Sequence, residues 1–301
     1  MAKNILISGG SGLVGAELSH FLKSRGYNVA ILSRRESSTK GLVFKWDLNT
    51  RYIDAEAIEF ADIIIHLAGE GVAAKRWSSK QKKKIIDSRV KSTELLFEQV
   101  KKAKKKPELI ISASAVGFYG HKPSDHVFVE EDASGSDFLS QVVRAWEESV
   151  MAFEDIGIRT MRIRIGVVLA KNGGFLEPLK KIVRFGLAAG VGSGRQFIPW
   201  IELSDLARIF HFAVEGRLSG SVYNAVAPEF ITNKELMRSL ARHMKRPFFL
   251  PNIPSFILRL LYGEMAEIIL YGNRVSSEKI RSEGFEFQFT SFDAVMEEYF
   301  D

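Results

Sequence analysis

Short apolar runs alternate with amphipathic stretches along most of the chain. The apolar runs predict strands that are covered on both faces, as in a parallel sheet, at residues 4–8, 29–33, 61–68, 109–114 and 160–169. Between them, apolar residues on one helical face predict helices at residues 13–25, in a lysine-rich segment beginning near residue 80, and at residues 138–153. This alternation predicts an α/β fold with a doubly wound parallel sheet.

A glycine-rich turn, ISGGSGLVG, joins the first predicted strand to the first predicted helix. Its glycines permit a tight turn, a close approach of the backbone to a pyrophosphate, and close packing of helix on strand. The helix N-terminus would supply amide donors and the positive end of the helix dipole. The turn therefore predicts a Rossmann-type dinucleotide site, and the alternative is a plain strand–turn–helix. The expected cofactor contacts in this loop are Gly9, Ser11, Gly12, Leu13, Val14 and Gly15.

The second predicted strand ends in ILSRRE, where an acid would mark an NAD-binding protein. Ser33, Arg34 and Arg35 occupy that place instead. A hydroxyl and two guanidiniums suit a 2′-phosphate, which arginine binds in bidentate fashion. The segment favours NADPH over NADH, although two surface arginines after a strand would look the same.

Composition and sequence pattern exclude several other classes of protein. The chain has 301 residues, no cysteine and 46% apolar residues, so it can bury a full core and has no disulfide framework or thiolate metal site. No apolar run approaches the ~18 residues of a membrane span, the start does not resemble a signal peptide, and we expect a cytoplasmic protein. The histidines are scattered without metal-ligand spacing, so no metal site is expected.

A net charge of +6 raises the question of nucleic acid binding. The lysines concentrate in KQKKK at 80–84 and KKAKKK at 101–106, near the two ends of one predicted helix. Such runs are usually solvated helix surface, and no zinc-finger or RNA-binding signature accompanies them. We therefore expect no nucleic acid partner.

Further motifs resemble the extended short-chain dehydrogenase/reductases, the group of nucleotide-sugar epimerases and dehydratases. They are KWDL, HLAGE, SASAVGFYG, RIGVVL and GSGRQFIPWIELSDLA. The resemblance places Ser114 at the family's catalytic serine and the segment 192–207 at the loop that closes the substrate side. The additional cofactor contacts that it implies are Asp47, Leu67, Ala68, Gly69, Ser112, Arg164 and Val167.

A narrower resemblance covers essentially the whole chain. HLAGEGVAAKRWSSKQKKKIIDSRVKSTELL and GEMAEIILYGNRVSSEKIRSEGFEF are similar to the atypical epimerase family proteins, some labelled cell division inhibitors, which end in a small domain of undefined function. We expect an NADP-binding Rossmann domain at residues 1–170, with a helix near 203–215 and a strand near 222–226 returning to it. Substrate-side loops and a small helical C-terminal domain would occupy residues 171–301, where Pro247, Pro251 and Pro254 introduce the last part.

The family's usual catalytic pair, a tyrosine followed four residues later by a lysine, is missing. Aligning the helix at 138–153 by Glu147 places Leu139 and Val143 at those positions, and no neighbouring frame restores the pair. The atypical group resembles this chain in the same respect. The family's usual chemistry therefore does not carry over.

Three residues are candidates to replace the missing pair, because hydride transfer to a carbonyl needs a nearby proton donor. Ser114 carries a hydroxyl that could equally cap the strand end. Tyr119 carries a phenol, for which aromatic packing is the favoured account. Arg89 falls where the family often has an asparagine, and its guanidinium could bind an anionic substrate or lie on the helix surface. The expected substrate-side residues are Glu70, Lys75, Trp77, Arg195 and Trp200, whereas we predict that His66 is a packed strand residue.

Two functional hypotheses follow. The first is an NADP-dependent reductase or epimerase with a non-standard proton donor, acting on a small molecule that is anionic or similar to a sugar nucleotide. The second is a catalytically silent regulator that senses NADPH and binds a partner. The sequence leaves the substrate, the reaction direction and the oligomeric state open, with a dimer as one option.

Overall fold

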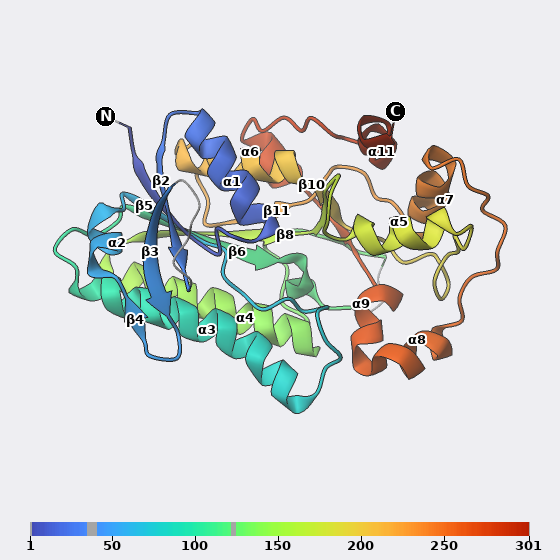
Figure 1. The fold of residues 1–301 in the computed structure, drawn as a ribbon, viewed down its shortest axis with the longest axis horizontal. Helices are drawn as coiled ribbons and strands as arrows, with labels where there is room; N and C mark the ends of the chain where they lie inside the picture. The colour runs from blue at the N-terminus through green and yellow to red at the C-terminus, as the bar shows by residue number, and fades with distance from the viewer. Residues whose placement is uncertain (1, 35–40, 122–124, 301) are drawn as a thin grey trace.

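The computed structural model of the protein describes residues 2–34, 41–121 and 125–300 (Figure 1). Its centre is an eight-stranded sheet in the order β11-β8-β6-β5-β1-β2-β3-β4, parallel except where β4 pairs with β3. The strands are β1 (Asn4–Ser8), β2 (Asn28–Ser33), β3 (Leu42–Asp47), β4 (Tyr52–Ile53), β5 (Ile63–His66), β6 (Leu109–Ala115), β8 (Arg159–Ile165) and β11 (Val222–Ala225). The predicted α/β fold with a Rossmann-type sheet is confirmed.

Helices cover both faces of the sheet, because its strands are apolar on both sides. On one face lie α1 (Leu13–Ser24) and α6 (Leu203–Val214); on the other lie α2 (Ala55–Phe60), α3 (Ser79–Lys102) and α4 (Phe138–Met151). Successive residues of β1 and β5 alternate between the two resulting cores, with Ile5, Ile7, Ile63 and Ile65 in one and Leu6 and Ile64 in the other. The layers fix the carboxyl ends of β1, β5 and β6 along one edge.

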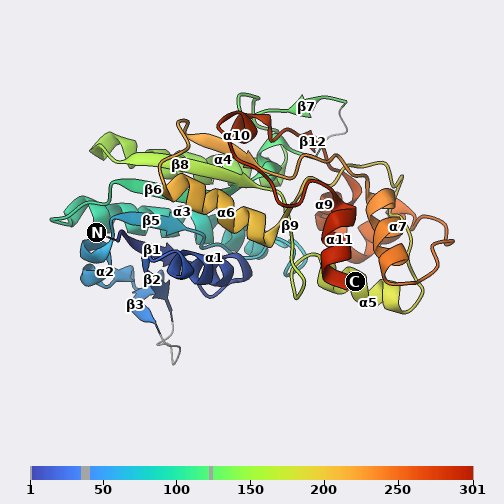
Figure 2. The same cartoon turned by 90° about the horizontal axis from the view of Figure 1, so that it is seen from above.

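The remaining elements gather beyond this edge, at the right of Figure 1, and Figure 2 shows the same end from above. They include α5 (Leu176–Arg184), α7 (Asn233–His243), α8 (Ser255–Tyr262), α9 (Glu267–Leu270), α11 (Phe292–Phe300) and the short helices η1 (Val116–Tyr119) and η3 (Gly263–Ala266). By contrast, η2 (Glu154–Ile156) precedes β8 at the opposite edge, and α10 (Glu278–Ser282) packs beside β11. Two small parallel pairs join β10 (Trp200–Glu202) to β9 (Val167–Leu169), and β12 (Arg274–Val275) to β7 (Val127–Phe128). A third core, containing Leu236, Leu240 and Phe292, holds α7 and α11 together.

The predicted strand at 160–169 is divided in two. Gly166 separates β8 from β9, and a Cβ on it would lie 2.6 Å from the carbonyl oxygen of Pro199. The chain therefore leaves the central sheet at this glycine and pairs with β10 instead. Strand β11 returns to the central sheet beside β8, and α6 packs beside α1.

None of the helices among the described residues is long and apolar enough to cross a membrane. No group of three or more histidine, cysteine, aspartate or glutamate side chains among them could hold a metal ion.

Candidate functional site

The glycine loop forms a tight cradle at the start of α1. Gly9 has a φ of +73°, and a Cβ on it would lie 2.9 Å from the carbonyl carbon of Leu67. A Cβ on Gly15 would lie 2.3 Å from the oxygen of Gly9, which explains why a side chain is absent there. Gly12 caps α1 with no side-chain hydrogen bond, so the first amides of the helix have no side-chain acceptor. The cradle fits a pyrophosphate because Gly9, Gly12 and Gly15 leave the backbone of the turn open to a ligand.

The strand order brings the other expected cofactor residues to the same edge. β1 lies between β2 and β5, so Ser33 at the end of β2 and Leu67 after β5 flank the glycine loop. Arg34 follows Ser33 and is exposed, whereas Arg35 lies outside the described residues. Asp47 ends β3, and its carboxylate accepts a hydrogen bond of 2.8 Å from the amide of Asn49.

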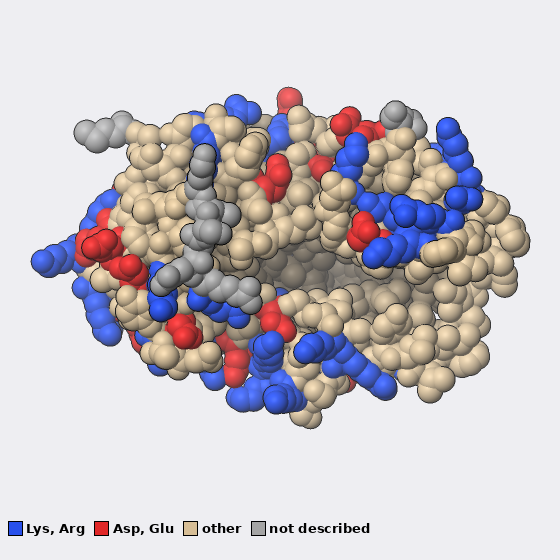
Figure 3. Space-filling model, in the orientation of Figure 1, with Lys and Arg blue, Asp and Glu red and all other residues tan. Residues whose placement is uncertain are grey.

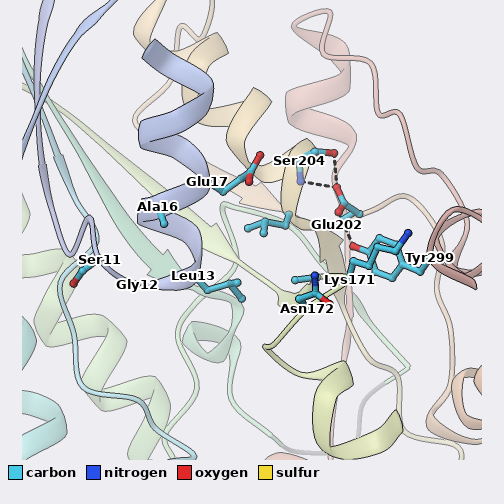
Figure 4. Close-up of a pocket in the computed structure, with 12 residues that line it drawn as sticks. Ser11, Gly12, Leu13, Ala16, Glu17, Lys171, Asn172, Glu202, Ser204 and Tyr299 are labelled. Carbon is cyan, nitrogen blue, oxygen red and sulfur yellow. Dashed lines mark hydrogen bonds between the residues drawn. The ribbon is translucent and has the colours of Figure 1, made fainter. Parts of the chain in front are cut away.

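A cavity of about 560 Å³ adjoins the glycine loop (Figure 4). The loop residues Ser11, Gly12 and Leu13 form one wall, and the segment 170–172 and the start of α6 form others. Tyr299 of α11 lines the cavity and donates a hydrogen bond of 2.6 Å to Glu202. Burial, together with the adjacent Glu202 carboxylate, raises the pKa of Tyr299 above its usual value. The C-terminal helix therefore reaches the immediate neighbourhood of the cofactor cradle.

Ser114 lies at the carboxyl end of β6 and is buried beneath α4. Its hydroxyl donates a hydrogen bond of 2.5 Å to Glu147, and Arg164 donates to both oxygens of the same carboxylate at 2.9 and 3.0 Å. The register explains the grouping, because Ser114 is paired with Arg164 across β6 and β8. The serine proton is thus held by an internal acceptor, and a lone pair of Oγ is left for a ligand donor.

Tyr119 belongs to the same buried network. Its phenol donates to Asn224 Oδ1 at 2.7 Å and accepts from Arg164 Nη1 at 3.0 Å. Burial raises the pKa of Tyr119 to about 12, even though Arg164 acts in the opposite direction. Asn224 is itself held by Glu130, whose carboxylate accepts from its backbone amide at 2.8 Å. The phenol is therefore protonated at neutral pH, and its proton points into the protein.

The positions of the missing pair face the end of β6. A Cβ built on Gly117 would lie 3.7 Å from Cβ of Leu139 and 4.0 Å from Cγ2 of Val143. Both side chains are buried. α4 therefore presents two apolar side chains toward η1, at the positions that the sequence alignment assigns to the missing pair.

Arg89 of α3 lies beneath the loop that follows β5. Its Nη1 donates to the carbonyl oxygens of Glu70 and Ile85, both at 3.0 Å, and its guanidinium lies 5.1 Å from the ring centre of Trp146. A Cβ on Gly69 would lie 3.1 Å from Cζ of Arg89. Burial lowers the pKa of Arg89 to about 10, and the group stays charged at neutral pH.

The expected substrate-side residues do not form one cluster. Glu70 pairs with Lys84 at 2.8 Å, Lys75 and Arg195 are exposed, and the indole of Trp77 packs on Phe138. Trp200 is fully buried against Phe292, so it is a core residue and offers no surface to a ligand. Sequence reasoning missed this because the glycine loop before it suggested an exposed segment. Figure 3 shows a hollow between the sheet and the C-terminal elements, with lysine and arginine side chains on both of its sides.

Residues 5–162 match the NAD dependent epimerase/dehydratase family, and residues 253–298 match a domain of unknown function, DUF1731. The chain belongs to the NAD-dependent epimerase/dehydratase family. The epimerase family protein YfhF of Bacillus subtilis is 35% identical over 294 residues, which cover 96% of this chain and 95% of that protein. The human epimerase family protein SDR39U1 is 31% identical over 299 residues, covering 98% of both chains. A crystal structure of human SDR39U1 (isoform 2) with NADPH has a TM-score of 0.87 at 28% identity and covers 98% of both chains.

These relatives confirm the resemblance to the atypical epimerase family proteins. They also agree with a C-terminal unit in this family member, because the DUF1731 match includes α8, α9 and α10. Two other expected cofactor contacts make hydrogen bonds to the backbone. Ser112 is buried, and its hydroxyl donates to the carbonyl oxygen of Ala113 at 2.9 Å. The amide of Val167 donates to the carbonyl oxygen of Pro199 at 2.7 Å.

His66 is a packed strand residue, as predicted. Its Nδ1 lies 2.6 Å from the Ser8 hydroxyl, and its Nε2 lies 3.1 Å from Ser92 and 3.2 Å from Thr93. Burial, with a smaller contribution from the charge of Arg89, lowers the pKa of His66 to about 3. The imidazole is therefore neutral under ordinary conditions.

Glu147 is the functional candidate that sequence reasoning did not select. It served only to align the helix, although a glutamate on the buried face of an amphipathic helix needs a partner. Its partners, Ser114 and Arg164, are 33 and 17 residues away in sequence. The register of β6 and β8 pairs Ser114 with Arg164, and the packing of α4 on these strands adds Glu147.

Proposed function

We propose that this family member binds NADPH at the glycine cradle and is an oxidoreductase or epimerase for a small anionic or sugar-nucleotide-like molecule. The backbone cradle supports the cofactor, since the turn excludes side chains at Gly9 and Gly15. The relative SDR39U1 was crystallised with NADPH. When bound, the cofactor supplies a hydride donor or acceptor, and the protein must supply orientation and a proton path.

A preference for NADPH over NADH rests on the end of β2. Arg34 is exposed there, next to Ser33, and belongs to neither of the two apolar cores on the faces of the sheet. A guanidinium in this place suits the 2′-phosphate. Titration of both cofactors against the wild type and Arg34→Ala tests the assignment, and equal affinities in the wild type would contradict it.

The proton path runs through Ser114 and Glu147. A ligand hydroxyl can give its proton to Ser114 Oγ while the serine passes its own proton to Glu147, because the serine donates to that carboxylate at 2.5 Å. The reverse transfer serves a reduction. Tyr119 takes a positioning role, since it holds Arg164 beside Glu147.

Two exposed cations among the expected substrate-side residues support an anionic substrate. Lys75 and Arg195 are exposed, and neither forms an ion pair with a described residue. Exposed cations around a cleft raise the local concentration of anions. The C-terminal elements would then close over the substrate from the side opposite the sheet.

The decisive experiment is hydride transfer from 4-deuterated NADPH across a panel of carbonyl compounds, including nucleotide sugars, followed by mass spectrometry. Deuterium in a product would support the enzyme, and Ser114→Ala and Glu147→Gln should each slow the transfer by about 10²–10⁴-fold, the usual range for an acid–base group. Tight NADPH binding without transfer to any compound would favour the second function.

That second function is an NADPH sensor that binds a partner. One observation favours it: both candidate donors, Ser114 and Tyr119, direct their protons to internal acceptors. A sensor would show a partner whose binding responds to NADPH and is insensitive to Ser114→Ala.

A further inference from the structure

The guanidinium of Arg89 is a half-buried cation without a carboxylate partner among the described residues. Among the described residues it forms no ion pair, and the nearest acidic side chain, Glu70, is paired with Lys84 instead. Burying an unpaired charge is costly, so such a group is generally paired or faces a functional site. Its only hydrogen bonds to described residues come from Nη1. Nε and Nη2 therefore keep their donors for something else.

A second orphan donor lies in contact with this guanidinium. The indole Nε1 of Trp146 is buried and has no hydrogen-bond partner among the described residues. Buried indole nitrogens usually have one. Two neighbouring side chains on α3 and α4 thus present donors and no acceptor, which indicates that an oxygen-bearing group completes the site.

Arg89 and Trp146 pack near Val143, the position at which the family has its lysine. Val143 and Trp146 are three residues apart on α4 and therefore lie on one face of the helix. Arg89 reaches that face from α3, lying over Trp146 and against the backbone of Gly69. The loop containing Gly69 follows β5 and adjoins the glycine cradle through Leu67 and Ala68. A cation is consequently available near the position where Val143 replaces the family's lysine.

We infer that Arg89 supplies the positive charge on the nicotinamide side of the cofactor site and makes the protein bind NADPH more tightly than NADP⁺. The inference rests on the proposed binding of NADP(H). The reduced nicotinamide ring is neutral and the oxidised ring carries one positive charge, whereas the rest of the two molecules is identical. A nearby guanidinium therefore penalises the oxidised form alone. Its free donors bind an oxygen of the same half of the cofactor.

The test compares the dissociation constants of NADPH and NADP⁺ by calorimetry for the wild type, Arg89→Met and Arg89→Lys. Lys91→Met is the control, because Lys91 is an exposed residue of the same helix whose one ion-pair partner among the described residues is Asp87. We expect the ratio Kd(NADP⁺)/Kd(NADPH) to fall by about fivefold or more in Arg89→Met, as charges within ~10 Å at an effective dielectric of ~20 imply. Arg89→Lys should keep most of the ratio, and Lys91→Met all of it.

The outcomes are distinct. If Arg89→Met weakens both cofactors equally, Arg89 only supports the Gly69 loop and the inference is overturned. If neither cofactor binds the wild type, the proposed function itself fails. If Arg89→Met does not fold, Arg89→Gln replaces it, since the amide keeps a donor for the Glu70 carbonyl while removing the charge; an unchanged ratio there also overturns the inference.

Discussion

Alanine substitutions at Gly15 and at Gly12 should have separate effects, the first on folding stability and the second on cofactor binding. At Gly15 the new Cβ would lie 2.3 Å from the oxygen of Gly9 and 2.7 Å from Cα of Gly10. Both contacts are with backbone, which cannot rotate away. At Gly12 the nearest atom is the oxygen of Gly9 at 3.4 Å, an ordinary contact, and φ is −79°, a value that alanine adopts readily.

The magnitudes follow from these distances. Overpacking costs about 1–3 kcal/mol, partly offset at Gly15 by the helix propensity of alanine, which is better by about 1 kcal/mol. An unfolding entropy of about 2.1 cal/mol/K per residue gives about 0.6 kcal/mol/K for 301 residues. Two backbone contacts place Gly15→Ala at the upper end of that range, so its net cost is about 2 kcal/mol and it should lower Tm by roughly 3 °C, and more if the turn opens. Gly12→Ala should change Tm by less than about 1 °C.

NADPH affinity should fall in the Gly12 variant, although its melting temperature hardly changes. Gly12→Ala should raise Kd by about tenfold or more, or about 1.4 kcal/mol, because the methyl group keeps the pyrophosphate from the backbone. Thermal melting and NADPH titration of both variants measure the two effects. A Gly12→Ala protein that binds NADPH like the wild type would refute the assignment of this turn to the pyrophosphate.

Buried polar side chains allow three further predictions. Arg164→Met should cost about 3–5 kcal/mol in urea unfolding, because it leaves the buried Glu147 carboxylate unpaired; a loss below about 1 kcal/mol would contradict the ion pair. His66 has a folded pKa of about 3, below its ordinary 6.5, so the stability that the neutral ring provides should be present above pH 6.5 and lost as the pH falls toward 3. A urea midpoint with equal acid dependence in wild type and His66→Gln would exclude this. Tyr119 has a folded pKa of about 12, above 10, so its contribution should be lost as the pH rises from 10 toward 12, and Tyr119→Phe should lack that alkaline loss.

The sequence carried local signals for much of the fold and the cofactor cradle. Uniform apolar runs such as ADIIIHLA mark buried parallel strands, and the glycine turn marks its own backbone constraints. β3 gave a weaker signal, since only Phe44 and Trp46 of its six residues are buried and a lysine stands between them. Its place beside β2 depends on tertiary packing.

The polar network could not be predicted from local patterns. Its members Glu147, Arg164 and Asn224 belong to α4, β8 and β11, and each would be read alone as an ordinary surface charge or turn residue. Trp200 shows the opposite error: a glycine-rich loop precedes it, yet its indole is fully buried in the third core. Side-chain direction at such places is set by which strand or helix packs nearby, which a single sequence does not reveal.

The network also bears on what the loss of the tyrosine and lysine means. If that loss were simple decay, Ser114 would be expected to remain as an isolated hydroxyl at the end of β6. Instead it donates to a carboxylate that a buried arginine holds by two hydrogen bonds, and a tyrosine bound to an asparagine holds that arginine in turn. Burying so many polar groups is costly unless each finds its partner, and within the described residues these five side chains all do. α4 carries buried apolar side chains at 139 and 143 and holds an acceptor for Ser114 at Glu147, while α3 contributes a cation at Arg89. A network in which every polar group is paired supports the proposal that Ser114 passes its proton to Glu147 when it takes one from a ligand.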